Sequence, residues 1–245
     1  MKKYFLIVLL IPFLGNAQLK KIVKKAKQKV STTSNSTTSN LTSGLDIGAA
    51  LKEALNNGVT KEVSKLTAAD GFYKNEAVKI LMPEELQKVD KTLRKMGMSN
   101  LADEGIKSLN RAAENAVKEA TPIFVTSIRN MSITDAKNIL MGSDNAATTY
   151  LQNSTSTALY GKFNPVVKES IGKVGADQIW SKIITQYNSL PLVSKVNPDI
   201  VDYVTNKALE GVFKMIAVEE KDIRGNLSSR TSNLLKDVFA LQDKK

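Results

Sequence analysis

The 245-residue sequence contains no cysteine and no histidine. Without these residues the chain cannot form a disulfide, a thiolate nucleophile, a zinc or haem site of the usual kind, or a Ser-His-Asp triad. Side chains could bind a metal only through oxygen atoms, which would favour Ca²⁺ or Mg²⁺. No motif for a metal or an organic cofactor stands out, so we expect neither.

Acidic residues are absent from residues 1–43, which hold eight of the lysines. The full chain has 35 Lys and Arg against 24 Asp and Glu, a net charge of +11, but residues 44–245 carry only +3. Hydrophobic residues make up 42% and charged residues 24% of the chain, as in globular proteins with a hydrophobic core. Because the positive charge is concentrated in the N-terminal segment, we expect no specific binding to nucleic acid.

The first 17 residues have the pattern of a signal peptide. Lys2 and Lys3 precede an apolar run that ends at Leu14, and the small residues Gly15 and Ala17 occupy the positions that signal peptidase reads. The run is shorter than the roughly 20 residues that span a bilayer. We therefore predict cleavage near Ala17, no transmembrane helix in the mature chain, and a periplasmic or secreted protein.

Residues 18–43 differ from the rest of the chain in composition. Residues 18–30 contain six lysines, and residues 31–43 are rich in Ser, Thr and Asn. We predict a flexible tail, because it contains too little apolar surface to join a core. For residues 18–30 the alternative is a basic amphipathic helix that attaches weakly to an anionic surface.

Residues 44–245 are predicted to form a single all-α domain of about ten helices. Hydrophobic residues recur at helical spacing through most of this range, and its length suits one core. Gly58 is expected to end the first helix and Pro165 to start a new one. Val78, Ile80 and Met82 alternate with other residues, which indicates a short extended piece and at most a minor two-stranded ribbon.

Several polar residues are placed to cap helices. Ser132 and Asp135 have the spacing of a capping box. Asp144 is expected to cap the next helix, and Asn197 is expected to cap a long helix near the C-terminus. Trp180 and Tyr187 lie seven residues apart on one helical face, which predicts core packing or the wall of a ligand pocket.

Five segments resemble one bacterial family of exported proteins that is described only as a domain of unknown function. The similar segments are 70–72, 86–104, 109–124, 133–151 and 203–239, in that order along the chain. The resemblance covers about residues 46–240. It implies an exported helical domain and no known activity.

Two groups of charged residues are candidate polar sites. Arg111 and Glu114 lie three residues apart on one helical face, beside alanines that would let helices pack closely. Glu220 and Arg224 have the spacing of an i,i+4 ion pair, with Glu219 beside them and Arg230 close by in sequence. We expect Arg230 to pair with an internal acid such as Glu219 or Glu220, the alternative being a bound anion. Each group is either a structural ion-pair network or a functional site.

These observations favour a non-enzymatic binding or interaction protein of the cell envelope, with a protein or an apolar ligand as its partner. One alternative is an enzyme that uses carboxylates and arginines, with Mg²⁺ or Ca²⁺ as a candidate ion. The other alternative is attachment to an anionic surface through the lysine-rich tail.

Overall fold

The computed structural model describes residues 44–173 and 199–243, without Met96 and Met98, and a few single residues between 174 and 198. The predicted signal peptide (1–17), the tail (18–43), the predicted cap Asn197 and the pair Trp180 and Tyr187 all lie outside the described residues.

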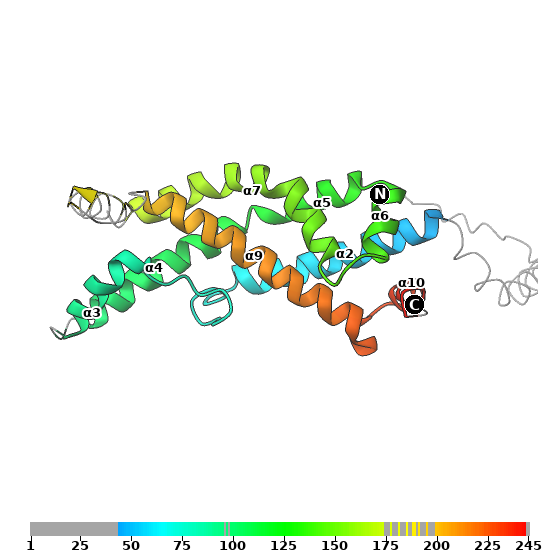
Figure 1. The fold of residues 1–245 in the computed structure, drawn as a ribbon, viewed down its shortest axis with the longest axis horizontal. Coiled ribbons are helices and arrows are strands. Elements are labelled where there is room, and N and C mark those ends of the chain that lie inside the picture. Colours follow the sequence, from blue (N-terminus) through cyan, green and yellow to red (C-terminus); the bar gives the residue numbers. More distant parts are fainter. Residues whose placement is uncertain are drawn as a thin grey trace, which may run out of the picture. The chain divides into compact units, whose positions relative to one another are not determined.

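All regular secondary structure in the described part of the chain is helical, in agreement with the predicted fold class (Figure 1). It contains no strand, so the predicted ribbon is absent from this part, and the predicted number of about ten helices is not confirmed. The α-helices are α2 (Gly44–Thr67), α3 (Gln87–Lys95), α4 (Ser99–Val117), α5 (Ala120–Asn130), α6 (Ile133–Leu140), α7 (Ala146–Gly172), α9 (Ile200–Gly225) and α10 (Asn233–Phe239), with 3-10 helices η1 (Glu84–Leu86) and η2 (Leu227–Ser229).

Two of the predicted helix boundaries are wrong. Helix α2 continues through Gly58, where a Cβ atom would lie 3.5 Å from Glu219 and 3.9 Å from Ile223 of α9. These are ordinary contact distances, so α9 packs against α2 at this position, and the glycine does not end the helix. Helix α7 continues through Pro165, because Phe163 and Val167 on either side of the proline are fully buried in the core.

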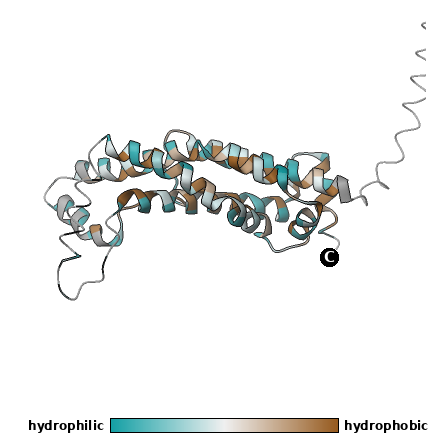
Figure 2. Cartoon of the chain, turned by 90° about the horizontal axis from the view of Figure 1, so that it is seen from above, coloured by the Kyte–Doolittle hydropathy of each residue, from teal (hydrophilic) through white to brown (hydrophobic). Residues whose placement is uncertain are grey.

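The main core forms where α7 packs against both α4 and α9. Phe124 of α5 and Phe213 of α9 meet edge to face in this core, with ring centroids 6.0 Å apart. Gly211 of α9 lies against the ring of Phe72, which a Cβ atom would approach to 2.7 Å. Along the helices, hydrophobic and hydrophilic residues alternate as amphipathic packing requires (Figure 2).

A second hydrophobic cluster joins the beginning of α2, helix α6 and the C-terminal helix α10. Leu51, Leu140 and Val238 are among its most deeply buried members, each with 1% or less of its surface exposed. None of the described helices combines the length and the hydrophobicity needed to cross a bilayer.

Candidate functional site

The structure does not bring the six predicted site residues together. Arg111 and Glu114 lie on α4, whereas Glu219, Glu220 and Arg224 lie in the last turns of α9 and Arg230 follows η2. Within the described part of the chain, no hydrogen bond or ion pair joins the α4 pair to the other four residues.

Glu114 and Arg111 hold the loop that follows α2. One oxygen of the Glu114 carboxylate accepts hydrogen bonds from the backbone N–H groups of Phe72 (3.1 Å) and Tyr73 (3.3 Å). The other oxygen accepts from Arg111 at 2.5 Å, and Arg111 also donates to Asp70 at 2.5 Å. All of these bonds are internal, so the arrangement fastens the loop to α4.

The backbone of this loop is tightly turned. Asp70 has a φ of +68°, a left-handed conformation that Asp tolerates better than most residues. A Cβ atom at Gly71 would lie 2.3 Å from the carbonyl oxygen of Lys65, so only glycine fits there. Hydrogen bonding from Lys74, together with the nearby charge of Arg111, lowers the pKa of Asp70 and keeps it ionised.

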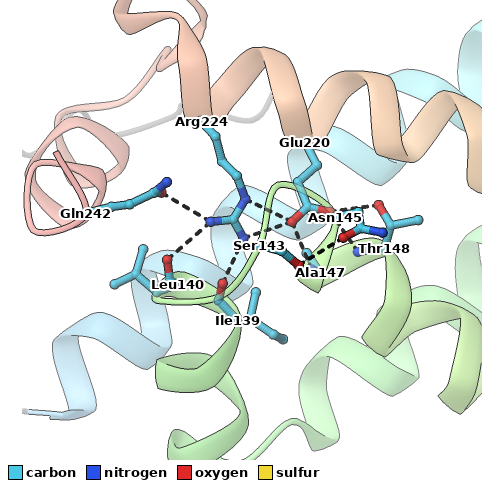
Figure 3. Close-up of polar contacts among 9 residues, drawn as sticks. All are labelled: Ile139, Leu140, Ser143, Asn145, Ala147, Thr148, Glu220, Arg224 and Gln242. Carbon is cyan, nitrogen blue, oxygen red and sulfur yellow. Dashed lines mark hydrogen bonds and ion pairs between the residues drawn. The ribbon is translucent and has the colours of Figure 1, made fainter. Parts of the chain in front are cut away.

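Glu220 binds the beginning of α7 (Figure 3). Its carboxylate accepts hydrogen bonds from the backbone N–H groups of Ala147 (2.9 Å) and Thr148 (2.8 Å) and from the Thr148 hydroxyl (2.7 Å). Arg224 donates to the same carboxylate at 2.8 and 3.0 Å. The prediction that Asp144 caps this helix is wrong, because the charge that occupies the free N–H groups comes from α9.

Arg224 also binds the end of α6. Its guanidinium donates to the carbonyl oxygens of Ile139 (2.8 Å) and Leu140 (3.2 Å), which lie in the last turn of that helix. The pair of Glu220 and Arg224 therefore stabilises a negative helix end and a positive helix end at once, across the turn between α6 and α7 (Figure 3). Both side chains are buried, with exposed fractions of 6% and 3%.

Arg230 pairs with an acid, but not with either of the predicted ones. Its guanidinium forms a two-point ion pair with Asp243 at 2.6 and 3.0 Å. Glu219 instead binds Lys61 of α2 at 2.6 Å, and Glu220 binds Arg224. The last helix begins at Asn233, so Arg230 lies in the preceding loop and points toward the residues that follow α10.

A cavity beside Glu219 and Glu220 is too small for an organic ligand. It is bounded by residues of α2, α7, α9 and α10 and has a volume of about 30 Å³, enough for about one water molecule. The described residues also contain no group of three or more acidic side chains arranged to hold a metal ion.

One surface groove was not predicted from the sequence. It has a volume of about 730 Å³ and lies between residues 77–87 and the first half of α9. The alternation at Val78, Ile80 and Met82 was the one sequence signal for this region, since it indicated an extended piece. Among the residues that line the groove are Ile80, Leu81, Met82, Tyr203, Asn206 and Gly211.

Asn110 of α4 binds the back of this segment. Its side-chain amide accepts from the N–H of Ile80 (2.8 Å) and donates to the C=O of Ile80 (2.8 Å), as a neighbouring strand would. The amide thus supplies the hydrogen bonds that a second strand of the predicted ribbon would have made. On the opposite side, the C=O of Leu81 accepts from the Tyr203 hydroxyl at 3.1 Å.

The comparisons with known proteins give a family. A model of the family DUF4197, described as a protein of unknown function, matches residues 41–240. The chain belongs to the DUF4197 family. The match confirms the resemblance found in the sequence. Comparisons with curated proteins and with solved structures found no match.

The DUF4197 segment includes all six predicted site residues and both walls of the groove. It ends shortly after Phe239, so Gln242 and Asp243, which bind Arg224 and Arg230, lie beyond the matched residues.

Proposed function

We propose that this DUF4197 protein is an exported, non-enzymatic binding protein that holds an extended segment of a partner polypeptide in the groove between residues 77–87 and α9. Export is supported by the signal-peptide pattern of residues 1–17. The proposal of a polypeptide partner is based on the backbone of Leu81.

The two hydrogen bonds of Ile80 to Asn110 require the N–H and C=O of Ile80 to point to one side. This is the geometry of an extended backbone, in which the next residue directs both groups to the other side. The C=O of Leu81 follows this rule and faces Tyr203 of α9. The N–H of Leu81 therefore also faces the groove, and it has no partner among the described residues.

The surroundings of this N–H suit a peptide. Leu81 is 54% exposed, so its side chain provides an apolar contact beside the free donor. The groove volume falls within the range of roughly 300–1,000 Å³ that is usual for ligand sites. Lysines and acids both line the groove, so it favours a partner without a strong net charge. A polypeptide that adds its backbone to an exposed extended segment is a common form of recognition.

A pair of variants at Leu81 tests the backbone contact. Peptides would first be selected from a displayed library of random 12-residue sequences with the mature chain, residues 18–245, and their affinities measured by titration calorimetry. Leu81→Pro removes the N–H and favours the extended conformation that Ile80 already has, so the fold should persist. We expect Leu81→Pro to weaken peptide binding at least tenfold and to leave the melting temperature nearly unchanged.

Leu81→Ala is the matched control, because it keeps the N–H and removes only the apolar contact. It should weaken binding less than Leu81→Pro. Tyr203→Phe frees the C=O of Leu81 and should leave peptide affinity equal or higher. Equal affinity of the selected peptides for the wild type and Leu81→Pro would contradict the proposal.

A further inference from the structure

Two buried arginines near the C-terminus flank one aromatic ring. The guanidinium carbons of Arg224 and Arg230 lie 5.7 and 5.3 Å from the centre of the Phe239 ring. The side chains of both arginines are nearly inaccessible, with 3% and 2% of their surface exposed. Each arginine also binds an oxygen acceptor from the residues that follow α10.

Most donors of the two guanidiniums are fixed by groups that belong to the helices. Arg224 is held by Glu220 and by the last carbonyl groups of α6. Arg230 donates to the carbonyl oxygens of Ile223 (3.0 Å) and Arg224 (2.8 Å) in the last turn of α9. These contacts orient both arginines without any help from the chain beyond α10.

The remaining donors bind Gln242 and Asp243, which follow α10. Arg224 donates to the side-chain oxygen of Gln242 at 3.1 Å, and Arg230 forms its two-point pair with Asp243. The Asp243 side chain is 42% exposed, so the acceptor on the buried Arg230 is reached directly from solvent. The backbone N–H groups of Gln242 and Asp243 both donate to the carbonyl oxygen of Phe239. One turn of backbone hydrogen bonds therefore connects these two residues to the end of α10.

The two arginines differ in the acid that neutralises each of them. Glu220 compensates Arg224 inside the helical core, whereas among the described residues Asp243 alone compensates Arg230. Displacing residues 242–243 would leave one buried positive charge with a planar two-point donor, and beside it one N–H group of Arg224. This combination is complementary to a carboxylate that has a neutral oxygen atom next to it.

We propose that Arg224 and Arg230 form a binding site for a carboxylate ligand of this kind, and that Asp243 and Gln242 of the same chain occupy it in this structure. The two arginines and Phe239 belong to the DUF4197 segment, whereas the residues that fill the site lie beyond it. Residues 242–243 are thus an internal competitor for the ligand. The site lies at the other end of α9 from the groove, so either proposal can fail without the other.

Asp243→Asn in the mature chain tests this proposal, because it removes the competing charge and keeps the size of the side chain. The probes are lactate, which has a hydroxyl beside its carboxylate, and an acetylated hexapeptide with the sequence of residues 240–245. We expect Asp243→Asn to bind at least one probe ten times or more tighter than the wild type in titration calorimetry. Tighter binding of lactate would assign a small hydroxy acid, and tighter binding of the hexapeptide would assign a polypeptide.

The double variant Asp243→Asn, Arg230→Lys is the control, because lysine keeps the charge and loses the two-point geometry. It should lose the gain in affinity. Hydrogen exchange on the wild-type chain gives a second readout: saturating probe should speed exchange at residues 240–243. If neither probe binds Asp243→Asn better than wild type, or if the double variant keeps the gain, the proposal is wrong.

Discussion

Helices α6 and α7 begin in different ways, although both have the same unsatisfied N–H groups in the first turn. At α6 the Ser132 hydroxyl accepts from the N–H of Asp135, and the Asp135 carboxylate accepts from the N–H of Ser132, as the sequence predicts. At α7 the side chain of Asn145 makes no cap hydrogen bond, and Glu220, 73 residues from Ala147, binds the first turn instead.

The difference has a consequence for stability. The α6 cap is complete within four residues and would form wherever this segment is helical. The α7 cap exists only when α9 is docked, and its carboxylate is buried together with Arg224. We therefore expect changes at α7 to affect the whole fold and changes at α6 to remain local.

The largest effect should come from Glu220→Ala. The substitution leaves Arg224 buried without its partner and the first turn of α7 without an acceptor, which should cost about 3–5 kcal/mol in the free energy of unfolding. Urea denaturation of the mature chain measures this. Glu219→Ala is the control on the neighbouring residue, because Glu219 pairs with a half-exposed lysine and should contribute less than about 1 kcal/mol.

A double variant separates the ion pair from the cap. Glu220→Ala with Arg224→Ala should lose less stability than the sum of the two single variants, since no uncompensated charge remains. Additive losses would mean that the pairing of the two charges contributes nothing and that their separate contacts with α6 and α7 account for the whole effect.

Asn110→Ala should have the next largest effect. Asn110 is fully buried, and it supplies both a donor and an acceptor to Ile80 across a long sequence separation, as Glu220 does for α7. Its loss leaves two backbone groups of the segment without partners and should cost about 2–3 kcal/mol. Urea denaturation gives the magnitude, and faster hydrogen exchange at Ile80 would locate it; unchanged exchange there would contradict this account.

Ser132→Ala should cost less, about 1 kcal/mol, which is usual for the loss of a helix cap. The effect should be confined to the first turn of α6 in a hydrogen-exchange experiment. Faster exchange throughout α7 as well would show that the starts of α6 and α7 are coupled. It would contradict the expectation that changes at α6 remain local.

The smallest expected effect is a change in folding stability at acid pH. Hydrogen bonds from the hydroxyl and the backbone N–H of Ser132 lower the pKa of Asp135 below its usual value. A carboxyl with a lowered pKa in the folded state stabilises the protein above its unfolded pKa, and this contribution disappears as pH falls through the folded pKa. The stability difference between wild type and Asp135→Asn should therefore shrink as pH falls below about 4, as measured by thermal unfolding at a series of pH values.

Contacts within one helix were predictable from spacing. The ion pairs Arg111–Glu114 and Glu220–Arg224 and the box of Ser132 and Asp135 follow from helical geometry, which places residues three or four positions apart side by side. The all-α class follows from the same periodicity.

Contacts between elements were not predictable in this way. The partner of Arg230 is Asp243, the cap of α7 is Glu220, and Asn110 takes the place of a second strand beside Ile80. Gly58 and Pro165 lie within continuous helices because neighbouring helices pack there. The groove beside Leu81 depends on how the segment 77–87 lies along α9.

The sequence alone determined which residues share a helical face, because backbone geometry sets that locally. Only the packing of the helices decided which distant group each buried charge and N–H would find, because those distances depend on the whole fold.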